Sequence, residues 1–343
     1  MKNLILVLSF SCSLITFANS QVDALFAEYD KPNVPGAAVA IFKEGTVAYQ
    51  KAYGLARVKG GVPATLSTNF RLASLTKQFT AMGIMILVDK GKLSFQDHIT
   101  DMFPDFPSYG KKITVEHLLH HQSGLIDYED NIPSGLQGQL SDADVLNILK
   151  KETGTYFTPG SQYRYSNGGY CTLSSIIAKV SGLSFPEFMR REVFSPLGMK
   201  HSLVYVAGGP TIENRAYGHT GTSETDQNVT SATLGDGGVY TSVEDWFLWD
   251  EALYHNPLVS PSLQEAAFSP GVLSDGSKTS YGYGWMLDTY HGLFRQAHTG
   301  STIGFRTAVT RFPEKHLTVV VFVNRAGSAP WETARQVADL YLK

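Results

Sequence analysis

The sequence predicts an α/β protein of the α+β kind, in which one antiparallel sheet is formed from both chain ends, flanked by helices and interrupted by an inserted all-helical lobe. Strand patterns occur near the start of the chain, helical patterns fill the middle, and strand patterns return after about residue 235. This order is typical of a single sheet that carries a helical insertion. We expect 21–90 and 235–343 to share the sheet and 91–234 to form the mainly helical lobe, all within one domain at 21–343.

The first elements are a short amphipathic helix at 22–29 and a hairpin. Residues 36–42 and 46–53 are runs rich in apolar side chains, and Lys43-Glu44-Gly45 between them supplies the turn. A long helix should follow from Leu75 to about Lys90, where Gly91 ends it.

That long helix is the most informative element, because residues 81–88 carry no charge on any side. A helix that is apolar all round belongs in the interior of a large protein. Its first turn is nevertheless polar, with Ser74, Thr76, Lys77 and Gln78. We therefore expect the beginning of this buried helix to face a cavity.

The remaining elements follow from the same periodicities. Helices are expected at 114–121, 143–151, 173–180, 185–194, 243–254, 261–268 and 331–342. Strands are expected at 239–241, 282–287, 293–297, 304–311 and 317–323. The last of these is a continuous apolar run, which indicates a central strand buried on both faces.

Composition excludes some functions. The chain has 343 residues with 43% hydrophobic and 17% charged, enough for a sizeable core. A formal net charge of −3 and the lack of any basic run argue against nucleic-acid binding.

The first twenty residues predict a secretory signal peptide, because a positive start at Lys2 precedes an apolar run and the small-x-small site Ala18-Asn19-Ser20. We expect an exported protein, periplasmic or secreted by a bacterium, with no stable membrane insertion after signal removal. The competing interpretation is a membrane anchor, for which the apolar stretch is short. Removal of the signal leaves Cys171 alone, so no intrachain disulfide is expected.

Ser74 and Lys77 lie three residues apart, so on a helix their side chains are neighbours. A serine hydroxyl becomes a good nucleophile only when a nearby base takes its proton. Lysine can be that base where burial or positive charge lowers its pKa. The competing interpretation is a helix cap beside a solvent-facing lysine.

Two further stretches could complete a site. Tyr165 and Asn167 would lie on the same side of an extended segment and could shuttle a proton and orient a carbonyl. His298-Thr299-Gly300-Ser301 follows an expected strand, where a peptide-like substrate could dock and the Ser301 N–H could pair with that of Ser74 as an oxyanion hole.

Ser-x-x-Lys, Tyr-x-Asn and a final [Lys/His]-Thr-Gly, in this order, resemble the motifs of the penicillin-recognising serine enzymes. Further stretches resemble the class C β-lactamase/DD-peptidase family: 70–81, 113–125, 159–167, 194–199 and 235–240. The resemblance spans roughly residues 24–325. It implies an α/β sandwich with an all-helical lobe, no cofactor and no metal.

By this resemblance Ser74 is the nucleophile, Lys77 and Tyr165 share the base and acid roles, and Asn167 positions the substrate. Residues 298–301 are the docking strand.

Class C β-lactamases usually have lysine where this chain has His298, whereas some DD-peptidases of the family have His-Thr-Gly. The resemblance therefore implies a D-alanyl peptide or amide substrate. The alternatives are a class C-like β-lactamase, a carboxylesterase, or a penicillin or muropeptide sensor that does not turn over. Oligomeric state stays open.

A competing interpretation is a metal site, because His117, His120 and His121 would share one helix face. No acidic or cysteine partner has a supporting spacing, and His121 belongs to the family's own His-x-Ser-Gly turn. We therefore expect no metal.

Overall fold

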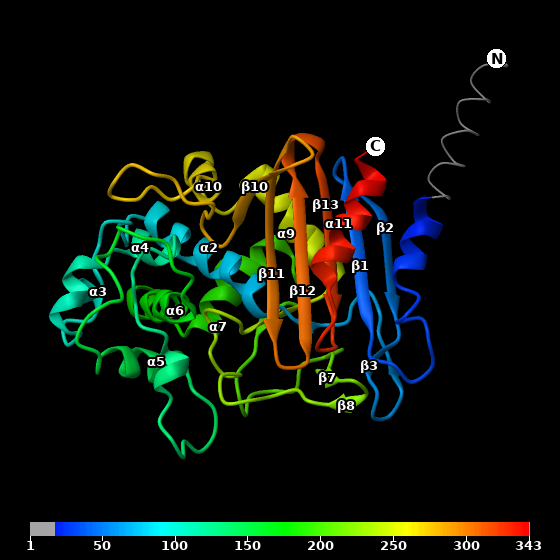
Figure 1. Ribbon diagram of the computed structural model, residues 1–343, viewed down its shortest axis with the longest axis horizontal. Helices are drawn as coiled ribbons and strands as arrows, with labels where there is room; N and C mark the ends of the chain where they lie inside the picture. The colour runs from blue at the N-terminus through cyan, green and yellow to red at the C-terminus, as the bar shows by residue number, and fades with distance from the viewer. Residues whose placement is uncertain (1–17, 343) are drawn as a thin grey trace.

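Strands from both ends of the chain lie side by side in one six-stranded antiparallel sheet (Figure 1). The computed structural model describes residues 18–342. In spatial order the strands are β10 (Met286–Tyr290), β11 (Leu293–Thr302), β12 (Phe305–Phe312), β13 (Leu317–Val323), β1 (Ala37–Lys43) and β2 (Thr46–Tyr53). β1 pairs with β13 so that Val39 lies opposite Val321. The predicted fold class is confirmed, as is β13 as a strand buried on both faces.

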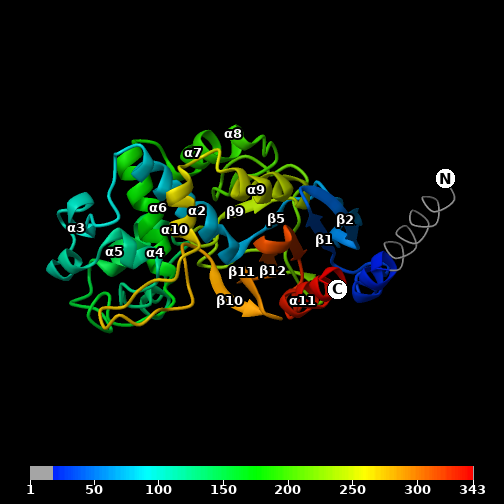
Figure 2. The same ribbon diagram turned by 90° about the horizontal axis from the view of Figure 1, so that it is seen from above.

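The two faces of the sheet are covered by different helices, as Figure 2 shows. The last helix α11 (Pro330–Tyr341) packs on β12 and β13, and residues 18–25 form a helix that adds Val22 to the same hydrophobic cluster. α9 (Val243–His255) covers the opposite face. Because successive strand residues point to opposite faces, Val319 belongs to the α11 cluster and Val320 to the α9 cluster.

The predicted long helix is α2 (Thr76–Asp89), which begins after a 3-10 turn at Ala73–Leu75. Its side chains from Thr76 to Leu87 are buried. It packs on α6 (Asn167–Ser181), and a Cβ at Gly83 would lie only 2.6 Å from the Cε of Met189. α2 therefore runs from the sheet into the centre of the helical part.

The helical part contains several shorter elements beside α6. They are α3 (Ile99–Met102), α4 (Val115–Leu119), α5 (Asp142–Leu149), α7 (Phe185–Met189) and α8 (Ser195–Leu197), with 3-10 turns at Ser108–Lys112 and Tyr128–Asn131 and a π-helical turn at Arg190–Phe194. α10 (Pro261–Ala267) and a 3-10 turn at Pro313–Lys315 lie later in the chain.

Short strands form three smaller sheets. They are β5 (Phe70–Arg71) with β9 (Val239–Thr241) and β6 (Leu203–Val204), β3 (Leu55–Arg57) with β4 (Val62–Pro63), and β7 (His219–Thr220) with β8 (Ser223–Glu224). The segment 203–224, predicted within the helical lobe, contains three of these strands. It also bridges to the sheet region, where His219 pairs with Arg325.

Three local predictions were wrong in extent. β10 begins at Met286 and not at Gly282, because Gly284 has a left-handed φ of +78° and its Cα sits against the start of α2. β11 continues past Ala297 to Thr302, since its pairing with β12 carries it on. Asn167 is not extended, because Ser166 caps a helix that begins there.

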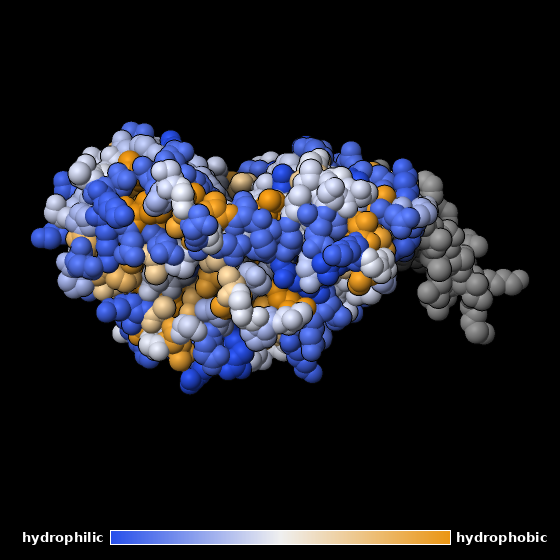
Figure 3. Space-filling view, turned by 90° about the horizontal axis from the view of Figure 1, so that it is seen from below, coloured by the Kyte–Doolittle hydropathy of each residue, from blue (hydrophilic) through white to orange (hydrophobic). Residues whose placement is uncertain are grey.

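Hydrophobic residues appear as separate patches among hydrophilic ones on the face seen in Figure 3. Within residues 18–342, no helix combines the length and the apolar character that a membrane span requires. The predicted signal peptide lies almost wholly outside the described residues, as does Cys12.

Candidate active site

Ser74 stands in the 3-10 turn that leads into α2, and its neighbour Ala73 has a φ of +50°. A left-handed conformation is costly for a residue with a Cβ, so the surrounding structure must hold it. β11 does so from one side, because a Cβ at Gly300 would lie 2.1 Å from the Leu72 carbonyl oxygen. The Thr307 hydroxyl also donates to that carbonyl at 2.8 Å. The predicted docking strand and the segment that carries Ser74 are therefore in direct contact, and only glycine fits at position 300.

Lys77 is fully buried and its Nζ makes three hydrogen bonds. It donates to Asn167 Oδ1 at 2.9 Å, to the Asp236 carbonyl oxygen at 3.1 Å, and lies 3.2 Å from Ser74 Oγ. The Tyr165 ring centre lies 4.9 Å from the same nitrogen. The four residues predicted from two separate motifs, Ser74, Lys77, Tyr165 and Asn167, are thus brought together around one nitrogen.

Asn167 is oriented by a residue that the sequence analysis missed. Its Nδ2 donates to Glu129 Oε1 at 2.9 Å, which leaves Oδ1 to face Lys77. Glu129 is an exposed residue, but partial desolvation of its carboxyl raises the pKa of that group, and the hydrogen bond from Asn167 opposes this. Glu129 lies in the 3-10 turn Tyr128–Asn131, 38 residues before Asn167, so no local pattern announces it.

The loop that offers the Asp236 carbonyl is held by another missed residue. Asp142, at the start of α5, accepts hydrogen bonds from the backbone N–H of Leu234 at 2.7 Å and of Gly235 at 3.0 Å, and from the hydroxyl of Ser174. Burial raises the pKa of this carboxyl to about 7. In the sequence, the segment 235–238 was noted only because it resembles the family. In the structure it presents a backbone acceptor to Lys77.

The opposite side of the site is the end of β11. Met286, the first residue of β10, lies opposite Ala297, so Thr299 and Ser301 lie on a stretch of β11 that β10 leaves uncovered. Such an open edge can pair with an extended substrate. Ser301 is exposed and Gly300 faces Ala73, so the open edge of β11 lies beside the turn that carries Ser74.

His298 lies on this strand but is buried and does not face solvent. Its Nδ1 lies 2.7 Å from the Thr299 carbonyl oxygen and its Nε2 lies 2.9 Å from the Tyr281 hydroxyl. Burial, followed by the positive charge of Lys77, lowers the pKa of His298 to about 3. The imidazole is therefore neutral at physiological pH.

The three histidines near α4 do not form a common metal site. His117 bonds the helix start at Thr114, His120 bonds the Tyr281 carbonyl, and His121 has a left-handed φ of +58° and accepts from the Ser166 N–H at 3.1 Å. Among the described residues, the group with metal-ligand spacing is Asp142, Cys171 and Asp236. The oxygens of Asp142 are already used by the loop 234–235 and Ser174.

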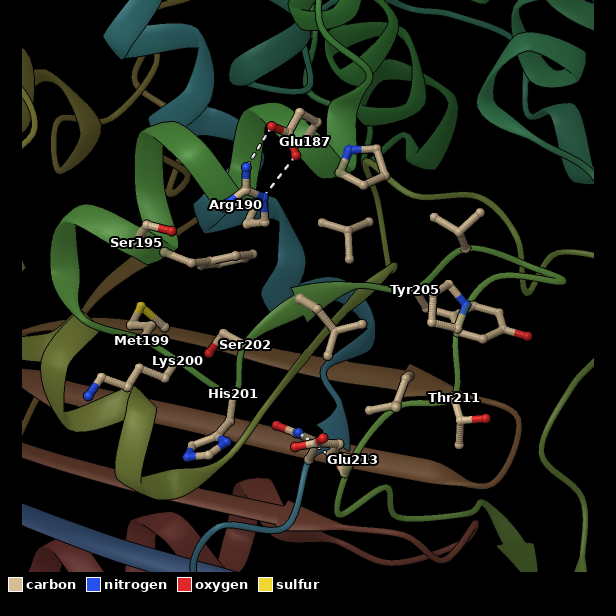
Figure 4. A pocket seen from close by; sticks show the side chains of 18 of the residues that line it. Glu187, Arg190, Ser195, Met199, Lys200, His201, Ser202, Tyr205, Thr211 and Glu213 are labelled. Atoms are coloured by element: carbon tan, nitrogen blue, oxygen red, sulfur yellow. Dashed lines mark hydrogen bonds and ion pairs between the residues drawn. The ribbon is translucent and has the colours of Figure 1, made fainter.

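A separate groove of about 880 Å³ lies along β6, α7 and the loop 205–213, and none of the predicted site residues lines it (Figure 4). In this view Glu187 and Arg190 face each other on the helix that forms one wall. The predicted docking residues Thr299, Gly300 and Ser301 line a different hollow, of about 460 Å³.

A serine beside a buried lysine, on a sheet with an inserted helical part, defines a class of serine hydrolase. The chain belongs to the β-lactamase family, because the model of the family described as "Beta-lactamase" matches residues 22–343.

Curated relatives agree with this assignment. Penicillin-binding protein 4* of Bacillus subtilis (strain 168) is 32% identical over 309 residues, which cover 84% of this chain and 68% of that protein. D-aminopeptidases of Gluconobacter oxydans (strain 621H) and Brucella anthropi are 29% and 27% identical, covering 96% and 86% of this chain. The chain spans only 62% and 57% of the length of these two relatives.

Solved structures share the fold. The octameric penicillin-binding protein homologue from Pyrococcus abyssi has a TM-score of 0.80 at 26% identity, covering 96% of this chain and 77% of that one. A D-amino acid amidase from Ochrobactrum anthropi SV3 has a TM-score of 0.78 at 24% identity, covering 96% and 97%, and shows likeness of fold alone.

Proposed function

We propose that this chain is an exported serine hydrolase that forms an acyl-enzyme on Ser74 and cleaves amide bonds on the carbonyl side of a D-alanine-like residue. The observation that carries the proposal is the contact of Lys77 Nζ with Ser74 Oγ at 3.2 Å inside a buried site. Relatives named D-aminopeptidase and penicillin-binding protein support the choice of D-configured peptides or amides. The apolar N-terminal pattern supports export.

The proposed chemistry begins with proton transfer from Ser74. A neutral Lys77 can donate its two N–H bonds to Asn167 Oδ1 and the Asp236 carbonyl, which directs its lone pair at Ser74 Oγ. Ser74 Oγ then attacks the substrate carbonyl carbon while its proton moves to the Lys77–Tyr165 pair. The tetrahedral oxyanion is stabilised by the N–H groups of Ser74 and Ser301.

Collapse of this intermediate breaks the C–N bond, and the leaving amine takes a proton from the same pair. Water hydrolyses the resulting ester and restores Ser74. Asn167 and the open edge of β11 hold the acyl chain. Several classes of substrate share this chemistry, so the identity of the nucleophile does not determine the substrate. A panel of candidate substrates is needed to identify it.

The first test is covalent labelling. A p-nitrophenyl ester of D-alanine or a β-lactam should leave an adduct on the peptide that contains Ser74, as measured by mass spectrometry. Ser74→Ala should lose at least about 10³-fold in turnover, since the nucleophile is gone, whereas Ser262→Ala, an exposed serine on α10, should not. An adduct elsewhere together with an active Ser74→Ala would refute the mechanism.

The second part of the test is a substrate panel of D-Ala-D-Ala peptides, D-alanyl amides and esters, p-nitrophenyl butyrate and nitrocefin. We expect higher kcat/KM for the D-alanyl substrates, amides and peptides alike, than for p-nitrophenyl butyrate or nitrocefin. Fast nitrocefin turnover would instead identify a β-lactamase, and butyrate hydrolysis without D-peptide activity would identify an esterase. A single stoichiometric acylation without turnover would identify a sensor.

A further inference from the structure

Tyr281 joins the docking strand to the helical part of the protein, although no motif singled it out. Its hydroxyl contacts His298 Nε2 at 2.9 Å, and its backbone carbonyl contacts His120 Nδ1 at 3.0 Å. Its ring lies among those of His121, at 4.6 Å between centres, and Tyr165, at 6.1 Å. It is fully buried, so these contacts exclude water from the back of the docking strand.

The hydrogen bonds of His298 determine where its proton lies. A carbonyl oxygen can only accept, so Nδ1, which lies 2.7 Å from the Thr299 oxygen, must carry a hydrogen. A neutral imidazole has one N–H, which leaves Nε2 bare. The Tyr281 hydroxyl is then the donor and Nε2 the acceptor.

The alternative arrangement is a protonated His298 that donates to Tyr281. The Tyr281 hydroxyl would then have to donate its own hydrogen bond to the hydroxyl of Tyr170, which lies beside it. The Tyr170 hydroxyl donates to the Leu119 carbonyl at 2.9 Å and can accept, so this arrangement is geometrically open. It would bury a charged imidazolium, which is strongly unfavourable because the charged form loses its hydration.

We propose that Tyr281 is a positioning residue that holds His298 as a neutral imidazole, so that the docking strand selects substrates whose leaving group carries no carboxylate. The selectivity rests on the proposed function of the Ser74 site, whereas the state of His298 does not. With His298 neutral, the three hydrogen bonds of Lys77 engaged, and burial holding the pKa of His121 well below its ordinary value, none of these three groups offers a free positive charge beside Thr299.

Arg306 is another cation near the docking strand, and it lies opposite Ser301 in the β11–β12 pair. Its Nη1 donates to the backbone carbonyls of Thr302 at 2.7 Å and Phe305 at 2.6 Å, within its own hairpin. It therefore serves the turn, and the variant Arg306→Gln tests whether it also binds a substrate carboxylate.

The first experiment is independent of any substrate. Protein with ¹⁵N-labelled histidine is examined by long-range ¹H–¹⁵N NMR from pH 5 to 8, and His298→Gln identifies the signal among the 10 histidines. We expect wild-type His298 to remain in the Nδ1–H form throughout. Tyr281→Phe should let the ring titrate or change tautomer in this range, whereas Tyr163→Phe, a more exposed neighbouring tyrosine, should not. A wild-type His298 that titrates near its ordinary pKa would overturn the proposal.

The second experiment compares kcat/KM for D-alaninamide and for D-Ala-D-Ala, two substrates that differ in the leaving group. Wild type should favour the amide. His298→Lys should shift the ratio toward D-Ala-D-Ala by at least about 10-fold, the effect of one charge-assisted hydrogen bond. A wild-type preference for D-Ala-D-Ala that Arg306→Gln abolishes would refute the selectivity, and failure of both substrates would refute the proposed function while leaving the NMR result intact.

Discussion

The site lies between a helical wall, which carries Lys77, Asn167 and Glu129, and a strand wall, which carries Thr299, His298 and Tyr281. The hydrogen-bonded chains of the two walls differ in charge. The chain on the helical wall has an ionisable group at each end, because Glu129 accepts from Asn167 and Asn167 accepts from Lys77. The strand wall is a neutral chain, in which Tyr281 donates to His298 and His298 donates to the Thr299 carbonyl. In both chains an uncharged middle residue has its orientation fixed by the partner behind it.

From this difference we infer a separate task for each wall. Proton transfer requires a group whose charge can change, and Lys77 lies on the wall where carboxylate and carbonyl oxygens compensate a positive charge. Substrate docking requires an edge of unchanging hydrogen-bonding character, and a neutral imidazole supplies it. The division predicts that variants of the helical wall change the rate of the chemical step, whereas variants of the strand wall change the choice of substrate.

The largest effect should come from the proton-transfer pair. Lys77→Ala and Tyr165→Phe should each lower kcat by about 10²–10⁴, as expected for loss of a positioned acid or base. Because the Tyr165 ring lies 4.9 Å from Lys77 Nζ, the two act as a unit, and the double variant should lose far less than the product of the single losses. Steady-state kinetics of all four proteins, with folding checked by circular dichroism, make this measurement. Multiplicative losses would show that the two residues serve separate steps.

The contact between Ser74 and Lys77 could be predicted from sequence because the two residues share one helical turn, and the hairpin 36–53 because its strands are adjacent in the chain. Glu129, Asp142 and Tyr281 could not, because each reaches the site through a contact between distant segments. The start of α6 was missed for a local reason. Gly168 and Gly169 have low helix propensity, but Ser166 caps the Gly169 N–H at 3.1 Å and packing against α2 supplies the remaining stability.

A smaller effect is expected on stability at Asp142. Its pKa is raised by burial from 3.8 to about 7, so the folded protein binds a proton more tightly than the unfolded chain does. The free energy of unfolding should therefore fall as pH rises from about 4 to 7, by up to about 1.4 kcal/mol per pH unit from this group, and level off above. Asp142→Asn removes this contribution.

Urea denaturation of wild type and Asp142→Asn at pH 5, 6, 7 and 8 measures the difference. The variant is expected to show a flatter pH dependence, together with a reduced kcat, because the loop that presents the Asp236 carbonyl to Lys77 loses one acceptor. Asp144→Asn on the same helix is the control, since its carboxylate is largely exposed and its pKa is lowered by Ser141. Parallel curves for wild type and Asp142→Asn would show that Asp142 does not titrate in this range.

The smallest effect should come from Glu129, the outermost member of the chain on the helical wall. Glu129→Gln keeps a carbonyl that can accept from Asn167 Nδ2, so only the charge assistance of one hydrogen bond is lost, which is about 1 kcal/mol or roughly 5-fold in kcat/KM. Glu129→Leu removes the acceptor altogether and frees Asn167 to turn its Nδ2 toward Lys77, which should cost more than the glutamine variant. Asp130→Asn, which changes the adjacent exposed carboxylate, should leave kcat/KM unchanged.

If Gln and Leu at position 129 were equally harmless, Asn167 would be oriented by Lys77 alone and the hydrogen-bonded chain of the helical wall would end at Asn167. If Gln were as damaging as Leu, the negative charge of Glu129, and not its hydrogen bond, would be what Lys77 requires.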